Sequence, residues 1–72
     1  MEEKDSPGDA PYERLLRIGE VMRMTGLAKS TIHLKWRKGE FPSPVKLFEG
    51  GRSLGWKQSE IREWIQSRNR AE

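Results

Sequence analysis

Hydrophobic residues recur at helical spacing in three stretches of the chain, and the first stretch lies near residue 20. Ile18, Val21 and Met22 follow one another at i, i+3 and i+4, which places them on one face of a helix. Gly26 comes just after this group, and glycine readily adopts the left-handed backbone that ends many helices. The pattern therefore predicts a short helix over about residues 19–25.

A second helix is predicted over about residues 29–38, after a turn at residues 26–28. The stretch has no proline and no internal glycine, and Ile32 and Trp36 lie one turn apart, so they mark its buried side. Two short helices joined by a tight, glycine-containing turn form a helix-turn-helix unit. The outward side of the second helix is basic and hydrogen-bonding, with Ser30, Leu34 and Arg37 at its centre and Thr31, His33 and Lys38 beside them.

The next stretch changes character because two prolines exclude a helix there. Apolar residues alternate over residues 45–47 and 54–56, which is typical of short strands, and the glycine pair at 50–51 permits a turn between them. We therefore expect a small hairpin. Lys46 and Arg52 lie near its tip, so the hairpin is a basic wing.

A third helix is predicted over about residues 58–68, because Ile61, Trp64 and Ile65 share one helical face. Its acidic residues come early and its basic residues late, as the helix dipole favours. The expected fold is mainly α with a small β-hairpin wing. It is a winged helix-turn-helix with three helices and a two-stranded antiparallel hairpin between the second and third helices.

Charge divides the chain into two parts. Residues 1–13 hold five acidic residues against Lys4, a net charge of −4, and they lack the aliphatic side chains of a core, so we expect a disordered acidic tail. The remaining residues hold 13 Lys and Arg against 6 Asp and Glu, a net charge of +7. With 72 residues the chain has room for one domain, expected over residues 14–69, and its basic excess is typical of nucleic-acid binders.

Enzymatic chemistry is disfavoured by the residue inventory. His33 is the only histidine, cysteine is absent and both aspartates lie in the expected tail, so we expect no catalytic triad, metal site or cofactor. No apolar run approaches the roughly 20 residues that cross a bilayer, and the N-terminus does not resemble a signal peptide. We expect a cytoplasmic protein without a membrane partner, associated with the nucleoid when it is bound to DNA.

The aromatic residues allow two interpretations. Trp36, Trp56, Trp64 and Phe41 could form a stacking platform for single-stranded nucleic acid, or they could pack into the core. Their helical and strand spacing relative to aliphatic neighbours favours core packing.

Several motifs occur in an order and spacing that resemble the AlpA family of prophage regulators, which is related to excisionases and to MerR-like winged-helix domains. They are Leu16-Arg17-Ile18 with Glu20-Val21, Thr25-Gly26-Leu27, Ser30-Thr31-Ile32, Gly39-Glu40-Phe41-Pro42 and Gly51-Arg52-Ser53-Leu54-Gly55-Trp56 before Trp64. The resemblance covers about residues 14–66. It implies a short DNA-binding regulator whose helix from Lys29 enters the major groove while the hairpin approaches the adjacent backbone or minor groove.

This chain departs from the family pattern at three positions. Such proteins often have serine at position 28, an aromatic residue at 33 and a basic residue at 34, where this chain has Ala28, His33 and Leu34. Alanine at position 28 removes an expected helix N-cap, and Leu34 replaces an expected phosphate or guanine contact.

The expected DNA-contacting residues lie on the second helix and on the hairpin. They are Lys29, Ser30, Thr31, His33, Leu34, Arg37, Lys38, Lys46 and Arg52. We expect sequence-specific binding to double-stranded DNA by a transcriptional regulator of prophage or mobile-element genes. Because one small domain makes few base contacts, self-association or tandem binding on DNA is expected, and an integrase or RNA polymerase is a further candidate partner.

Two alternatives remain open from the sequence. An excisionase-like recombination directionality factor would bend DNA beside an integrase, with several copies bound side by side. A protein-interaction adaptor would use the same fold to hold a partner, and its binding would be insensitive to salt.

Overall fold

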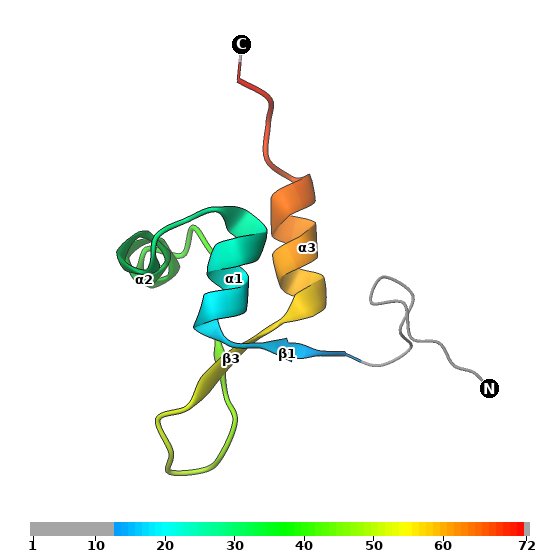
Figure 1. Ribbon diagram of the computed structural model, residues 1–72. Helices are drawn as coiled ribbons and strands as arrows, with labels where there is room; N and C mark the ends of the chain where they lie inside the picture. Colours follow the sequence, from blue (N-terminus) through cyan, green and yellow to red (C-terminus); the bar gives the residue numbers. More distant parts are fainter. Residues whose placement is uncertain (1–12, 72) are drawn as a thin grey trace, which may run out of the picture.

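Three helices pack around a three-stranded antiparallel sheet in the computed structural model, which describes residues 13–71 (Figure 1). In chain order the elements are β1 (Leu15–Leu16), α1 (Ile18–Thr25), α2 (Lys29–Arg37), β2 (Val45–Lys46), β3 (Leu54–Lys57) and α3 (Gln58–Gln66). The three expected helices are confirmed, with ends within two residues of the predicted ones. Residues 1–12, most of the expected tail, lie outside the described residues.

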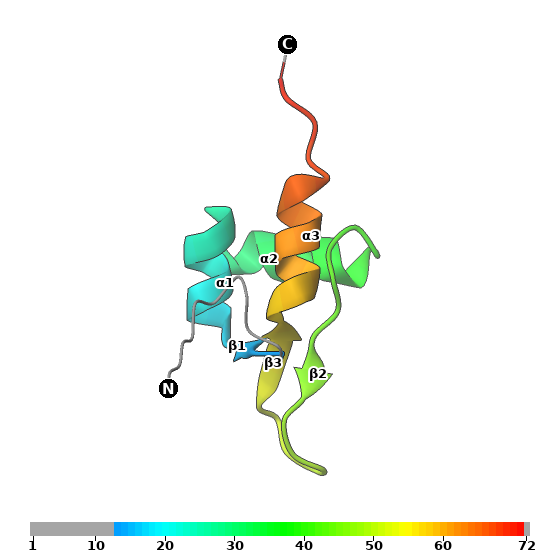
Figure 2. The same ribbon diagram turned by 90° about the vertical axis from the view of Figure 1, so that its right-hand side faces the viewer.

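The prediction of a two-stranded hairpin is wrong in strand number. The strand order is β1-β3-β2, so β3 is the central strand and β1 adds a third strand at its free edge. Leu16 pairs with Trp56, and Val45 pairs with Gly55. A two-residue strand has too few positions to show alternation, and it forms because β3 offers unpaired backbone groups. Figure 2 shows β1 and β2 on opposite sides of β3.

The turn of the hairpin is also longer than the expected glycine pair. Beyond β2, the backbone N–H of Leu47 donates to the carbonyl oxygen of Ser53 at 3.0 Å, and the N–H of Gly51 donates to the carbonyl oxygen of Phe48 at 3.2 Å. Gly50 has a φ of 72°, a backbone conformation that glycine adopts without a steric penalty. The turn therefore runs from Phe48 to Gly51.

The core draws one side chain from nearly every element. Its buried residues are Leu16 of β1, Val21 of α1, Ile32 of α2, Phe41 of the connection after α2, Trp56 of β3 and Ile61 of α3. Fully burying one such side chain contributes about 1.5–3 kcal/mol. Because every element except β2 supplies a single buried apolar residue, the helices and the sheet depend on one another for stability.

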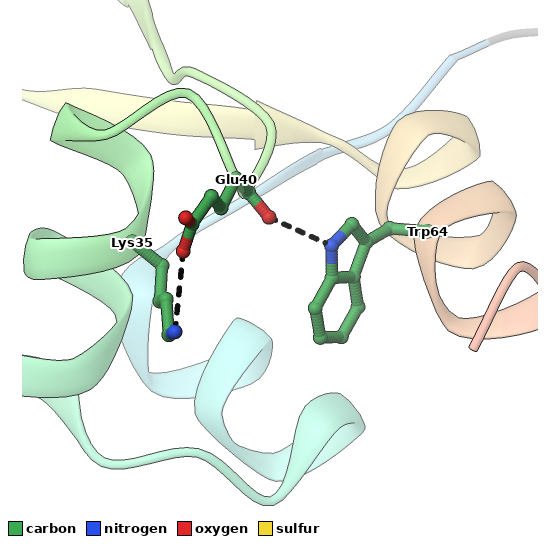
Figure 3. A network of polar contacts seen from close by, with 3 residues as sticks. All are labelled: Lys35, Glu40 and Trp64. Atoms are coloured by element: carbon green, nitrogen blue, oxygen red, sulfur yellow. Dashed lines mark hydrogen bonds and ion pairs between the residues drawn. The ribbon is translucent and has the colours of Figure 1, made fainter. Parts of the chain in front are cut away.

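Tryptophan side chains tie the connection after α2 to the sheet and to α3. The indole N–H of Trp56 donates to the carbonyl oxygen of Pro42 at 2.9 Å, and that of Trp64 donates to the carbonyl oxygen of Glu40 at 3.1 Å (Figure 3). The rings of Phe41 and Trp64 meet edge to face with centroids 4.8 Å apart. Trp56 is buried and Trp64 is half-buried against the core, which confirms the core interpretation of these aromatics.

The ends of the first two helices follow from single residues. Gly26 has a φ of 77° and its N–H donates to the carbonyl oxygen of Met22 at 2.8 Å, which confirms its predicted role in ending α1. Ala28 occupies the N-cap position of α2 and makes no side-chain capping bond, as expected from its methyl group. In the described part of the chain, no helix is long and apolar enough to span a bilayer.

Candidate nucleic-acid interface

The exposed side of α2 carries four of the residues predicted from the sequence. Ser30, Leu34, Arg37 and Lys38 are exposed, whereas Ile32 on the opposite side is buried in the core. Burial of Ile32 fixes the rotation of α2 about its axis, because residues at i, i+3 and i+4 share one face of a helix. The residues opposite Ile32 therefore face solvent. Leu34 is 54% exposed and lies among polar and basic neighbours.

Trp36 supports the two neighbouring side chains that border this face. The imidazole of His33 lies tilted against the indole of Trp36, with ring centroids 5.2 Å apart, and the guanidinium carbon of Arg37 is 5.9 Å from the centroid of the same indole. The indole in turn meets Trp56 edge to face at 5.9 Å. His33 and Arg37 are therefore positioned on an aromatic base that is anchored in the sheet.

The beginning of α2 forms a shallow hollow. Its lining residues are Ala28, Lys29, Ser30 and His33. Because the N-cap side chain of Ala28 is a methyl group, it leaves the backbone N–H groups of the first turn without a side-chain acceptor. Together with the positive end of the helix dipole and Lys29, these amides suit a phosphate oxygen.

Thr31 lies apart from the other predicted residues of α2. It is half-buried and lines a separate hollow with Leu27, Lys35, Glu40, Trp64 and Arg68, between α2 and α3. Lys35 in this hollow forms an ion pair with Glu40 at 3.2 Å, which Figure 3 shows beside Trp64. The structure therefore groups Ser30, His33, Leu34 and Arg37, and it does not bring Thr31 to their face.

The two predicted residues of the hairpin are exposed near its tip. Lys46 lies on β2, and Arg52 follows the turn. In Figure 1, α2 lies at the left of the domain and the loop between β2 and β3 extends below the sheet at the lower left, and both lie away from the beginning of β1. A helix and a loop on one side can contact the same ligand.

The cations of α2 and the loop are free to bind an anion. Among the described residues, Arg14 pairs with Glu20 at 3.2 Å and Lys35 pairs with Glu40, whereas Arg37, Lys38, Lys46 and Arg52 form no ion pair there. Unpaired, exposed cations on one side of a small domain attract polyanions over a Debye length of about 10 Å at 0.1 M salt.

Sequence reasoning did not anticipate one exposed side chain of the loop. Phe48 is 69% exposed at the start of the turn. The signal was present, since Phe48 breaks the alternation of Val45 and Leu47 and directly precedes the turn. Within residues 13–71, no cluster of three or more His, Asp or Glu side chains could hold a metal ion.

The fold and this surface define a small basic domain whose exposed helix and hairpin carry cations that form no ion pair among the described residues. Comparison with known proteins gives the family: the chain matches the family described as Prophage CP4-57 regulatory protein (AlpA) over residues 14–69. The chain belongs to the AlpA family of prophage regulatory proteins.

Two relatives illustrate the family. The chain is 47% identical over 60 residues to the uncharacterized protein ORF88 of Enterobacteria phage P4, across 83% of this chain and 66% of the phage protein. It is 37% identical over 60 residues to the DNA-binding transcriptional activator AlpA of Escherichia coli strain K12, across 76% of this chain and 84% of that protein. The chain thus spans just under two thirds of the phage protein. No solved structure matches the chain significantly.

Proposed function

We propose that this chain is a sequence-specific DNA-binding protein that regulates transcription of prophage or mobile-element genes. In this proposal α1 and α2 form a helix-turn-helix, α2 enters the major groove of duplex DNA, and the β2–β3 loop is a wing on the adjacent backbone or minor groove. The observation that carries the proposal is the set of exposed cations on α2 and the hairpin that form no ion pair among the described residues.

Phosphate contacts account for most of the affinity in this mechanism. Lys29, Lys38, Lys46 and Arg52 neutralise phosphates, and the free amides at the start of α2 bind a further phosphate oxygen. Each neutralised phosphate releases condensed counterions, so the affinity falls steeply as the salt concentration rises.

In this proposal, side chains at the centre of the exposed side of α2 select the bases. Arg37 reaches a guanine edge or a phosphate, Ser30 and His33 donate or accept hydrogen bonds, and Leu34 meets the methyl group of a thymine. A leucine fits this role because its side chain is exposed and uncharged, so it contributes specificity through shape and not through charge. The half-buried position of Thr31 beside α3 gives it a smaller share in this contact.

One domain of this size reads only a few base pairs. Tight binding therefore requires a second copy or tandem sites along the DNA. The name of the Escherichia coli relative, a DNA-binding transcriptional activator, supports regulation of transcription as the outcome of binding. RNA polymerase is then the partner expected at an activated promoter, and an integrase is the partner expected for a recombination role.

The test is a titration of the full chain against a labelled duplex from the region upstream of its own gene, at several salt concentrations. We expect Arg52→Ala to reduce the magnitude of the slope of log K against log salt by about 1, because it removes one phosphate contact. Arg37→Ala reduces the preference over a random duplex, because Arg37 lies at the centre of the face that selects bases. Arg70→Ala, which removes the same charge beyond α3, is the matched control and leaves the preference unchanged.

A folded wild-type protein that binds no duplex even at low salt would overturn this proposal. Salt-insensitive binding to a protein partner, indifferent to Arg37, Lys38 and Arg52, would instead indicate an adaptor.

A further inference from the structure

Phe48 is the most exposed of the large hydrophobic side chains in the described part of the chain. Its exposed fraction is 69%, compared with 54% for Leu34 and 44% for Leu15. An exposed phenyl ring gains no hydrophobic stabilisation in the free protein, so the fold itself does not account for it. Phe48 lies at the start of the turn between β2 and β3, at the outer end of the hairpin.

Two backbone hydrogen bonds close the loop around Phe48. The carbonyl oxygen of Phe48 accepts the N–H of Gly51 at 3.2 Å, and the Leu47–Ser53 bond at 3.0 Å closes the loop one residue before. Gly50 supplies the left-handed backbone that this turn needs. A loop that is ordered before binding loses little conformational entropy when its side chain enters a ligand.

The surroundings of Phe48 favour DNA over a protein partner. Leu47 points inward, since its Cδ2 lies 3.0 Å from the position that a Cβ on Gly55 would occupy. Phe48 is therefore the single exposed apolar side chain between Lys46 and Ser53, and the charged neighbours are two cations and Glu49. An isolated ring between cations is too small for the apolar centre of a protein interface, but it matches the space between two base pairs.

We propose that Phe48 is an apolar wedge that enters the minor groove and partly unstacks one base step, while Lys46 and Arg52 hold the flanking phosphates. This inference rests on the proposed DNA binding and adds a deformation of the DNA to it. The insertion opens the base step on its minor-groove side and kinks the duplex toward the major groove, so the protein reads the deformability of a step that α2 does not contact. Pyrimidine–purine steps deform most easily and are the expected targets.

The experiment measures unstacking and bending in the bound duplex with the full chain. The DNA carries 2-aminopurine at successive adenines beside the bound site, and end labels report the bend by energy transfer. We expect the wild-type protein to raise 2-aminopurine fluorescence at one step and to bend the duplex by about 20–90°. Phe48→Ala keeps salt-dependent binding, but it abolishes the fluorescence rise and lowers the bend below about 20°.

Two variants control for size and for exposure. Phe48→Leu retains an apolar wedge, so we expect it to bend the duplex nearly as much as the wild type does. If the bend did not depend on insertion of the side chain, the leucine and alanine variants would bend the duplex equally. Leu15→Ala removes another exposed apolar side chain, on β1, and bends the duplex as the wild type does. Thermal unfolding of each variant verifies that the fold is intact.

The outcomes separate this inference from the proposed function. If the wild type binds the duplex without unstacking it, or if Phe48→Ala bends it equally, the wedge is wrong while DNA binding stands. If Phe48→Ala leaves the bend unchanged and only weakens self-association in sedimentation, Phe48 contacts a second copy and the wedge is likewise wrong. If the wild type binds no duplex, both proposals fail.

Discussion

The carboxylate of Glu13 accepts two hydrogen bonds from Ser59, a residue 46 positions later in the chain. The backbone N–H of Ser59 donates at 2.8 Å and its hydroxyl donates at 2.7 Å. Ser59 lies in the first turn of α3, where backbone N–H groups lack partners within the helix. Lys57 occupies the N-cap position and makes no side-chain capping bond. Glu13, which lies 46 positions before Ser59 in the chain, caps the helix in its place.

The Glu13 contact makes stability depend on pH. The hydrogen bond from the Ser59 backbone, with the Ser59 hydroxyl and the charges of Lys57 and Arg62, lowers the pKa of Glu13 below its ordinary value of 4.5. A carboxyl whose pKa is lower in the folded state stabilises the fold above the unfolded value. This contribution is lost as the pH falls from about 4.5 through the folded pKa.

Glu13→Gln tests this dependence because it removes the charge and keeps the shape. We expect the variant to have a lower free energy of unfolding than the wild type at pH 7, and the difference to shrink below about pH 4.5. Urea titrations at several pH values measure it. Glu49→Gln in the hairpin loop is the control, and an equal effect there would show that net charge, and not the contact with Ser59, causes the change.

Ala28→Ser adds the missing N-cap of α2. The backbone of Ala28 already has the extended conformation of an N-cap, with φ −74° and ψ 156°. A serine oxygen there accepts an N–H of the first turn, so we expect stabilisation by about 0.5–2 kcal/mol in chemical denaturation. Ala28→Val gains no acceptor side chain, and a gain as large as that of serine would contradict the capping argument.

Trp56→Phe and Trp64→Phe compare a buried and a more exposed hydrogen bond. Trp56 is 2% exposed. Phenylalanine at this position removes the indole donor of the Pro42 carbonyl at a site that water does not readily reach. We expect a cost of about 1–3 kcal/mol. The bond of Trp64 to Glu40 lies in an exposed environment, where water replaces the donor, so the cost there is below about 1 kcal/mol. Equal losses in the two urea titrations would show that burial does not set the cost.

Gly26→Ala and Gly19→Ala have opposite expected effects on α1. Gly26 has a φ of 77° with nothing near the added methyl group, so alanine costs about 1–2 kcal/mol through backbone strain alone. Gly19 lies within the helix, and the nearest atom to its added methyl group is 4.0 Å away, so alanine stabilises α1 by about 0.5 kcal/mol. Melting temperatures measure both effects. We expect Gly26→Ala to melt below the wild type and Gly19→Ala to melt above it.

Much of the local structure was predictable because its signals lie within a few residues. The apolar spacing of Ile18, Val21 and Met22 indicates α1, and Gly26 marks its end because only glycine takes that backbone freely. The side of α2 that Ile32 buries follows from the same periodicity. The side chains predicted to contact DNA from that helix are exposed in the structure, except those of Thr31 and His33, which are half-buried.

The sequence by itself determined the helices, the basic excess and the aromatic core, since each depends on residue type and local spacing. Only the tertiary structure decided the strand β1 and the capping of α3 by Glu13. The physical reason is that these features depend on partners distant in sequence. A two-residue strand forms only beside the free edge of β3, and a carboxylate caps a helix 46 residues later only after the core has brought them together.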